Sequence, residues 1–273
     1  MRALFAAAVA VATAVAFAFL LLPLAAIFLR VPPGDLIGQL GDRVSRDALV
    51  VSLKTSAIAH GAVLVFGTPT AYLLARRRFR GRGLVLALVE LPLVLPPAVA
   101  GIGLLAAFGR VGLLGDELDA LGLRIGFTQT AVVLAVAFVE SPFYLRGAVA
   151  AFEAVDADLL AAARTLGAGP WRVFARVALP LAAAGLGAAS ALALARGLGE
   201  FGATIIFAGS LQGVTQTLPL AIYAQFEQDL DVALAISALF IVVGAAILVA
   251  LKAFGWLRFA SISPFRPAAS SSS

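Results

Sequence analysis

The residues of this chain that could do chemistry are ionisable side chains placed inside long apolar runs. Glu90, Glu140, Arg196 and Glu200 lie in such runs, and so does the single histidine, His60. A charge within hydrocarbon is costly, so these side chains either pair with a neighbour or line a polar path. Arg196 and Glu200 stand four residues apart, the spacing that allows an ion pair on one helix face. For Glu90, Glu140 and His60 the sequence favours structural pairing over a role in transport, with arginines at the membrane surface as partners of the two carboxylates.

Few residues are available for covalent or metal chemistry. The chain has no cysteine and one histidine, which excludes thiolate ligands, cysteine nucleophiles and zinc sites built on a histidine pair. No segment has the pattern of a Walker A loop. The scattered carboxylates offer no constellation for an intramembrane enzyme. We therefore expect no catalytic residue, no metal site and no cofactor bound by this chain.

The elements that carry the ionisable residues are predicted to be membrane spans. Apolar residues make up 62% of the 273 residues, charged residues 13%, and the mean hydropathy is +1.04. Because soluble domains carry about 25% charged residues, the composition predicts an all-α integral membrane protein. Crossing the hydrocarbon core takes about 20 apolar residues in a helix. The six predicted spans are Ala3–Phe28, Val50–Ala75, Leu84–Phe108, Thr130–Leu145, Leu179–Ala208 and Val232–Trp256.

The remaining segments complete the predicted organisation. Residues 1–49 hold the first helix and an external loop, residues 50–258 form the transmembrane domain, and residues 259–273 form a disordered cytoplasmic tail. Leu218–Phe226 is apolar but too short to span, which indicates a re-entrant or interfacial helix. The first apolar run is also compatible with a signal peptide, but it exceeds the usual length of about 7–15 residues. We expect an uncleaved helix.

The distribution of arginine and lysine predicts the orientation of the spans. With the N-terminus inside, the cytoplasmic segments carry thirteen of these residues and the outer loops carry six. The positive-inside rule then places both termini in the cytoplasm. Residues 76–82, with five arginines, contribute most. The same rule accounts for the net charge of +5, so we expect no nucleic-acid partner.

Residues 146–178 are too polar to span a membrane, yet their apolar residues are regularly spaced. The spacing is helical in residues 159–166 and again in residues 173–177. Gly167 interrupts the pattern, and Pro170 suits a first helical turn. The sequence therefore predicts two short helices joined at a glycine-rich corner between the fourth and fifth spans. Such a segment is either a binding surface for another protein or an amphipathic connector.

This segment resembles the cytoplasmic loop of permease subunits in bacterial ATP-binding-cassette importers. That loop has the form Glu-Ala-Ala, three residues, Gly, nine residues, Ile, one residue, Leu-Pro. In this chain Val177 stands at the Ile position and an alanine stands at the Glu position. The resemblance implies that residues 153–178 dock on the ATPase subunit. The positions concerned are Ala161, Ala162, Ala163, Gly167, Leu179 and Pro180.

A second stretch is similar to the molybdate, tungstate and sulfate permeases within that family. Residues 196–204 are Arg-Gly-Leu-Gly-Glu-Phe-Gly-Ala-Thr, and residues 213–223 are Gly-Val-Thr-Gln-Thr-Leu-Pro-Leu-Ala-Ile-Tyr. The second run looks more like molybdate permeases than sulfate permeases. Residues 71–79 and 91–97 also resemble this group. The similarity covers residues 50–251.

The resemblance implies a permease subunit of an ATP-driven importer for a tetrahedral oxyanion, with molybdate as the main reading and sulfate or tungstate as alternatives. It implies a homodimer in the bacterial inner membrane. The implied partners are a cytoplasmic ATPase, an extracytoplasmic oxyanion-binding protein and membrane lipid. ATP and magnesium are then bound by the ATPase, and this chain performs no covalent chemistry.

Prolines, glycines and small polar residues mark the predicted gate and translocation path. Pro92, Pro96 and Pro97 bend or break the third predicted span, and glycines around Arg196 and Glu200 loosen the fifth. An oxyanion path should offer neutral donors, including Ser210 and Gln216, since several arginines would hold a dianion too tightly to release it. The residues predicted for the gate and path are Pro96, Pro97, Arg196, Glu200, Phe201, Gly202, Thr204, Thr215 and Thr217.

A secondary transporter driven by an ion gradient is the alternative from another class. Its coupling sites would be Glu90, Glu140 and His60, but no convincing internal repeat accompanies them. Uptake that persists without an ATPase and collapses with an uncoupler would favour this alternative. A purely structural membrane subunit would leave the loop motif unexplained.

Overall fold

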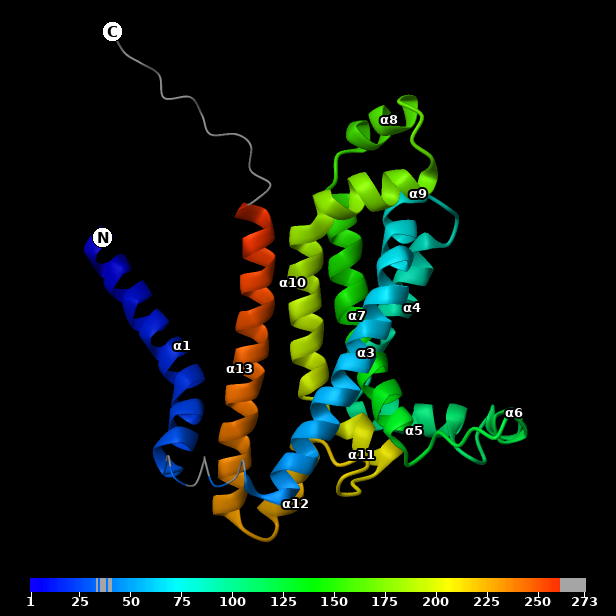
Figure 1. The fold of residues 1–273 in the computed structure, drawn as a ribbon. Helices are drawn as coiled ribbons and strands as arrows, with labels where there is room; N and C mark the ends of the chain where they lie inside the picture. The colour runs from blue at the N-terminus through cyan, green and yellow to red at the C-terminus, as the bar shows by residue number, and fades with distance from the viewer. Residues whose placement is uncertain (33, 35–37, 39–40, 261–273) are drawn as a thin grey trace. The chain divides into compact units, whose positions relative to one another are not determined.

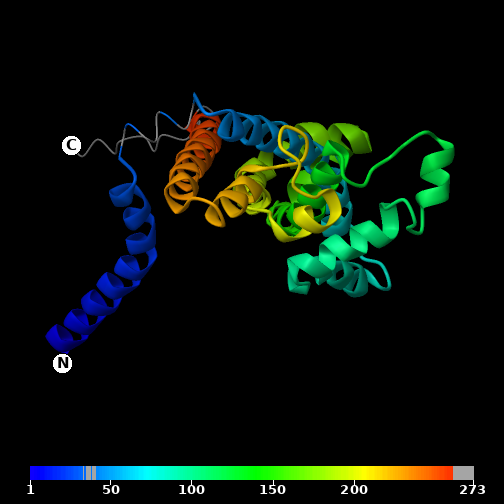
Figure 2. The same cartoon turned by 90° about the horizontal axis from the view of Figure 1, so that it is seen from below.

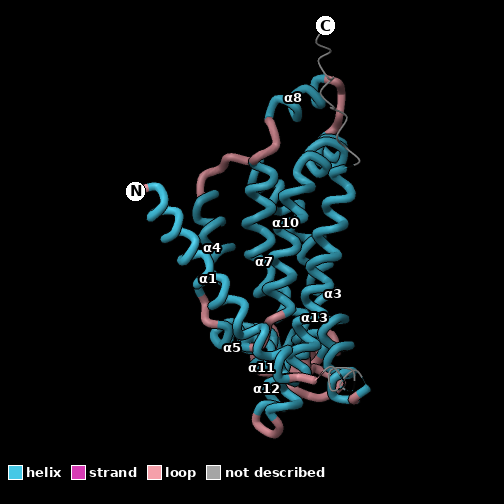
Figure 3. Tube along the Cα trace, turned by 90° about the vertical axis from the view of Figure 1, so that its left-hand side faces the viewer, coloured by secondary structure: helices cyan, strands magenta, loops and turns pink. Residues whose placement is uncertain are grey.

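The protein is built from helices, five of which are long and apolar enough to span a bilayer. The computed structural model describes residues 1–32, 34, 38 and 41–260, and within these residues no strand occurs (Figure 1, Figure 3). A sixth span arises if the bent pair α4–α5 is counted as one. The helices are α1 (Arg2–Arg30), α3 (Arg43–Arg76), α4 (Arg82–Val94), α5 (Pro97–Phe108), α6 (Gly115–Ala120), α7 (Gln129–Glu153), α8 (Ala157–Thr165), α9 (Pro170–Val173), the π turn η1 (Phe174–Ala178), α10 (Leu179–Leu198), α11 (Gly202–Ala208), α12 (Leu218–Phe226) and α13 (Leu230–Ala260). The predicted tail falls mostly outside the described residues, and α13 extends to Ala260.

The third predicted span consists of two helices, α4 and α5, that meet at a bend of 113°. The predicted break at the proline pair is confirmed. Leu95 is extended, as expected of a residue that precedes proline, and Pro96 has a non-helical ψ of 137°. Pro92 lies inside α4, so the helix ends at the adjacent prolines and not at Pro92.

The prediction of one continuous fifth span over residues 179–208 is wrong. α10 ends at Leu198, and the separate short helix α11 begins at Gly202. Glycines disfavour a continuous helix here because each costs about 1 kcal/mol relative to alanine. The Glu200 carboxylate then accepts the hydrogen bond of the Ala203 N–H, one of the donors that a new helix start leaves free. We call residues 196–203 the elbow.

The chain divides into two compact units. Unit 1 comprises Met1–Val51 and Ser210–Val243, and unit 2 comprises Ser52–Gly209 and Gly244–Ser273. Unit 1 has a small core of Ala48, Leu218, Ala221 and Ile236. Its α12 has nine residues, so the predicted short, non-spanning helix at residues 218–226 is confirmed.

Helices α7 and α10 pack closely in unit 2 through small residues. A Cβ atom added to Gly147 would lie 2.6 Å from the Ala189 methyl, and one added to Gly185 would lie 2.5 Å from the Ala151 methyl. Glycine and alanine at such positions let two membrane helices approach each other. This contact extends beyond the predicted end of the fourth span at residue 145, which explains why α7 continues to Glu153.

The two predicted short helices lie at one end of unit 2, opposite the end that holds α5 and α11 (Figure 1). α8 and α9 are joined at Gly167, whose φ of +81° lies in the region that favours glycine. Pro170 occupies the first turn of α9, as predicted. η1 then connects α9 directly to α10. We call α8 and α9 together the α8–α9 hairpin.

An aromatic cluster and an arginine join this hairpin to the long helices of unit 2. The ring of Phe174 in η1 lies 4.9 Å from the ring of Tyr72 in α3 and 6.2 Å from that of Phe152 in α7. Arg76 Nη2 donates to the carbonyl oxygens of Phe152 and Val155 at 2.6 and 2.7 Å. A cation is favourable there because α7 ends at this point. The ring of Phe174 also lies 5.5 Å from that of Trp171 in α9, so these contacts connect the hairpin to α3 and α7.

Candidate functional site

The elbow contains four of the nine residues predicted for the gate and path, namely Arg196, Glu200, Phe201 and Gly202. Arg196 Nη1 lies 2.9 Å from Glu200 Oε2, which confirms the predicted ion pair. The Glu200 side chain is 1% exposed and that of Arg196 is 31% exposed. The other carboxylate oxygen, Oε1, accepts the Ala203 N–H at 2.7 Å. Glu200 therefore holds the end of α10 and the start of α11 at the same time.

Helix α5 packs directly against the elbow and α11, at the same end of unit 2 (Figure 2). A Cβ atom added to Gly202 would lie 2.6 Å from Pro97 Cβ. A Cβ atom added to Gly101 would lie 2.8 Å from the Ala203 carbonyl oxygen and 2.9 Å from Ile206 Cβ. The bend that Pro96 and Pro97 create thus places α5 in contact with the elbow. Thr204 is fully buried in this region, and its hydroxyl has no hydrogen-bond partner within the described residues.

Separating α5 from α11 should impair transport. We expect Gly101→Leu to push the two helices apart and to reduce transport at least tenfold, because overpacking a close contact costs about 1–3 kcal/mol. Gly103→Leu is the matched control, since a Cβ atom at Gly103 meets no atom within 4 Å. Uptake in vesicles, normalised to the amount of folded protein, measures the difference. Equal uptake by the two variants would show that the α5–α11 contact is not needed.

The other residues predicted for the path lie in unit 1. Thr215 Oγ1 accepts the Leu211 N–H at 2.9 Å, and Gln216 Nε2 donates to Ser210 Oγ at 3.2 Å. These bonds shape the turn that precedes α12. Thr217 is buried, and its hydroxyl has no hydrogen-bond partner within the described residues. Thr204 and Thr217 are therefore the two predicted path residues with a buried, unused hydroxyl.

The residues predicted to couple to an ATPase lie on the α8–α9 hairpin and at the start of α10. Ala161, Ala162 and Gly167 are exposed, and Ala163 is half-buried. Pro180 is exposed in the first turn of α10, beside the half-buried Leu179. Leu159, Leu166 and Trp171 are also exposed, by 50, 87 and 76%. The hairpin thus carries large apolar side chains that are open to contact.

The structure corrects the predicted partner of Glu140 and confirms the one expected for Glu90. Glu90 Oε1 lies 3.7 Å from Arg146 Nε, an arginine near the hairpin end of α7. Glu140 instead is bonded to His60, and His60 Nε2 lies 2.9 Å from Ser190 Oγ. The sequence does not predict this pair, because His60 and Glu140 are 80 positions apart. Only the packing of α3 against α7 brings them together.

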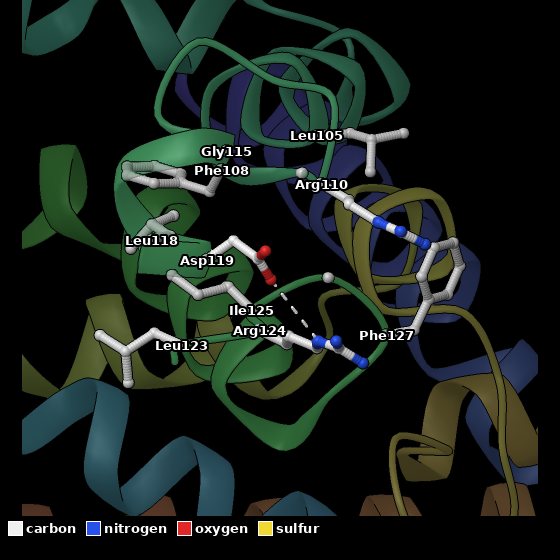
Figure 4. Close-up of a pocket in the computed structure, with 12 residues that line it drawn as sticks. Leu105, Phe108, Arg110, Gly115, Leu118, Asp119, Leu123, Arg124, Ile125 and Phe127 are labelled. Carbon is white, nitrogen blue, oxygen red and sulfur yellow. Dashed lines mark ion pairs between the residues drawn. The ribbon is translucent and has the colours of Figure 1, made fainter. Parts of the chain in front are cut away.

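A pocket of about 240 Å³ lies in the loop between α5 and α7 (Figure 4). Its walls are mainly apolar, and it contains an exposed ion pair in which Arg124 Nε lies 3.8 Å from Asp119 Oδ1. Phe127 lies at its edge with a φ of +60° and donates its N–H to the Phe207 carbonyl of α11 at 3.3 Å. An apolar pocket of this kind does not suit a strongly hydrated oxyanion, so we do not assign it to the transport path.

Comparison with known proteins assigns this arrangement to a family. A family model described as "Binding-protein-dependent transport system inner membrane component" matches residues 67–257. The chain belongs to this family. The match contains the α8–α9 hairpin, the elbow and α12, while His60 of α3 lies before its first residue. The chain is therefore a multi-pass inner-membrane permease component.

Several relatives agree with this assignment, and a solved structure shares the fold. The chain is 46% identical over 232 residues to the molybdenum transport system permease protein ModB of Mycobacterium tuberculosis, covering 85% of this chain and 88% of that protein. It is 45% identical to ModB of Escherichia coli, covering 66 and 79%. It is 37% identical to the sulfate transport system permease protein CysW of Synechococcus elongatus, covering 70 and 67%. A bacterial alginate ABC transporter chain matches the fold with a TM-score of 0.72 at 16% identity, covering 93% of both chains.

Proposed function

We propose that this chain is the membrane permease of an ATP-driven importer whose substrate is molybdate. The observation that carries the proposal is the identity of 46% over 85% of the chain to a molybdenum permease, against 37% over 70% to a sulfate permease. The chain works as a homodimer with a cytoplasmic ATPase and an extracytoplasmic binding protein. ATP hydrolysis takes place on the ATPase, and no cofactor is bound by the permease.

The α8–α9 hairpin is the docking surface for the ATPase in this proposal. Its exposed apolar residues, which include Leu166 and Trp171, are covered when the ATPase binds. The hairpin is then cytoplasmic, and the arginine distribution puts both termini on the same side of the membrane. The arginines of residues 76–82 support this orientation, because Arg76 and Arg82 both bond to groups near the hairpin, at the end of α7.

Movement of the hairpin reaches the elbow through α10. The ATPase pair closes when it binds ATP, and the contacts of Phe174 and Arg76 transmit this closure to α3 and α7. Helix α10 runs from η1 to the elbow, so a tilt of α10 displaces Glu200 and α11. Helix α5 moves with α11 because Gly101 and Gly202 leave no space between them. The path opens outward, accepts the anion from the binding protein and reverses after hydrolysis.

Affinity for the anion resides mainly in the binding protein. The buried hydroxyls of Thr204 and Thr217 offer weak, neutral donors to a passing anion. A dianion held by several arginines would leave slowly, which favours such a lining. Arg196 is engaged with Glu200 and serves the elbow, not the substrate.

Uptake by the reconstituted complex tests the substrate assignment. Vesicles containing this chain, the ATPase and the binding protein are given labelled molybdate with tungstate or sulfate as competitor. We expect ATP-dependent uptake that tungstate blocks and excess sulfate does not. Strong competition by sulfate would assign the importer to sulfate, and uptake without ATP would contradict the importer altogether.

The hairpin corner gives a separate test of coupling. Gly167→Val should lower ATP-driven uptake at least tenfold, because a β-branched residue at a φ of +81° strains the backbone by about 1–3 kcal/mol. Gly169→Val is the matched control, since Gly169 has a φ of −66° and open space around it. Co-purification of the ATPase and uptake are measured together. If Gly167→Val leaves both ATPase co-purification and uptake unchanged, the hairpin is excluded as the coupling element.

A further inference from the structure

A buried polar cluster joins three helices of unit 2. His60 of α3 is bonded through Nδ1 to Glu140 Oε1 of α7, and its Nε2 lies 2.9 Å from Ser190 Oγ of α10. The Glu140 side chain is fully buried and that of His60 is 12% exposed. Nothing in the transport cycle described above uses this cluster. An acid and a base in contact inside a membrane bundle nevertheless require an explanation.

The second oxygen of Glu140 faces the elbow. Glu140 Oε2 has no hydrogen-bond partner within the described residues. A Cβ atom added to Gly197 would lie 2.7 Å from it, so this oxygen touches the last turn of α10. Gly197 directly follows Arg196 in the chain. One carboxylate therefore contacts α3 through one oxygen and the elbow through the other.

The charge of this pair depends on the number of protons that it holds. Imidazolium with carboxylate and neutral imidazole with carboxylic acid contain the same number of protons, and both have no net charge. Removing one proton leaves a net negative charge on the pair, and adding one leaves a net positive charge. Either charge is unfavourable in a buried site without a further partner. The pair therefore stays buried without a further partner only while it keeps the number of protons that makes it neutral.

The neighbouring ionisable groups have partners of their own. On α10, Arg196 pairs with Glu200. On α7, Arg146 pairs with Glu90 of α4. Lys54 of α3 donates to Gln129 Oε1 at 2.8 Å. Among the described residues, these groups are therefore engaged elsewhere, and a charge on the His60–Glu140 pair gains no direct counter-ion from them.

We propose that His60 and Glu140 form a buried proton-binding site that positions the elbow. While the pair is neutral, Glu140 stays between α3 and Gly197 and supports the end of α10. When the pair gains or loses a proton, water or another counter-charge must enter, the carboxylate moves, and the elbow shifts with it. His60 and Glu140 are thus positioning residues, and gating is restricted to the pH range in which the pair is neutral. The role rests on the proposed permease function but not on the identity of the anion.

A spin label at the elbow tests this proposal without any substrate. The chain has no cysteine, so Gly199→Cys gives a single labelling site. Gly199 is exposed, and a Cβ atom there meets only the Ala195 carbonyl oxygen, at 3.9 Å. The labelled permease is assembled with its ATPase in vesicles, and the label's mobility is recorded from about pH 5 to about pH 9. We expect the mobility of the label to change with pH in the absence of substrate.

Variants separate the proton site from other causes of a pH response. The double variant His60→Gln with Glu140→Gln cannot titrate, so its label mobility should not change with pH. Ser190→Ala removes only a neutral partner and should shift the midpoint of the response. Glu90→Gln, a half-exposed carboxylate on another helix, should keep the parent profile. The proposal would be overturned if label mobility did not change with pH in the parent. It would also be overturned if the double variant showed the same pH dependence as the parent.

The two proposals fail in distinguishable ways. If label mobility depends on pH but the vesicles take up no molybdate, the substrate assignment is overturned and the proton site is supported. If the vesicles take up molybdate but label mobility does not depend on pH, the substrate assignment is supported and the proton site is overturned.

Discussion

Replacing Gly185 with leucine should prevent most of the protein from folding. Gly185 lies where α10 meets α7, and even a Cβ atom would stand 2.5 Å from the Ala151 methyl. A leucine there must force the two helices apart along their contact. Overpacking a dense core costs about 1–3 kcal/mol and sometimes more, a large part of a total stability of about 5–15 kcal/mol. We expect a sharp loss of membrane-inserted protein and a lower melting temperature in detergent.

Two further variants make this prediction specific. Gly187→Leu lies on the same helix, and a Cβ atom at Gly187 meets no atom within 4 Å, so it should fold like the parent. Gly185→Ala should destabilise the protein, and adding Ala151→Gly should restore it by removing the facing methyl. Equal melting temperatures for Gly185→Leu and Gly187→Leu would show that α7 and α10 do not pack through these residues.

Removing the Glu200 carboxylate should abolish most transport while leaving much of the protein folded. Breaking a buried ion pair by deleting one partner costs about 3–5 kcal/mol, and the partial exposure of Arg196 reduces this to about 2 kcal/mol because water solvates its charge. Glu200→Ala also leaves the Ala203 N–H without its acceptor. We expect uptake to fall at least tenfold, with the melting temperature lowered by a few degrees.

A graded set of variants separates the two contacts of Glu200. Glu200→Gln keeps an oxygen for the Ala203 N–H but loses the charge, so it should retain more uptake than Glu200→Ala. Arg43 and Asp47 form a pair with the same i, i+4 spacing at 3.8 Å, with Arg43 84% exposed. Arg43→Ala is thus a matched surface control and should leave uptake unchanged. Full uptake by Glu200→Ala would contradict the role of the elbow in gating.

Much of the fold follows from local sequence patterns. Long apolar runs predict the spans because a helix in lipid must satisfy its backbone internally and cover its surface with apolar side chains. The proline pair at residues 96–97 predicts the break before α5, and Gly167 with Pro170 predicts the corner of the hairpin. The i, i+4 spacing predicts the ion pair of Arg196 and Glu200. In each case the physical cause lies within a few residues of the chain.

Other features depend on contacts between distant segments. The apolar run at residues 179–208 predicts a continuous fifth span, since composition does not show that the Glu200 carboxylate bonds to the start of a new helix. The sequence predicts surface arginines as partners of Glu140, although its partner in the structure is His60 of another helix. The 113° bend between α4 and α5 and the contact of Pro97 with Gly202 were likewise not predictable. A proline ends a helix without fixing the direction of the next one.

The sequence by itself determined that this protein is an α-helical membrane permease with a helical hairpin between two of its spans, because span length and motif spacing are local properties. Only the tertiary structure decided which buried charges meet and where helices come closest. His60, Glu140 and Gly197 lie far apart in the sequence, and they meet because the fold packs α3 and α10 against α7.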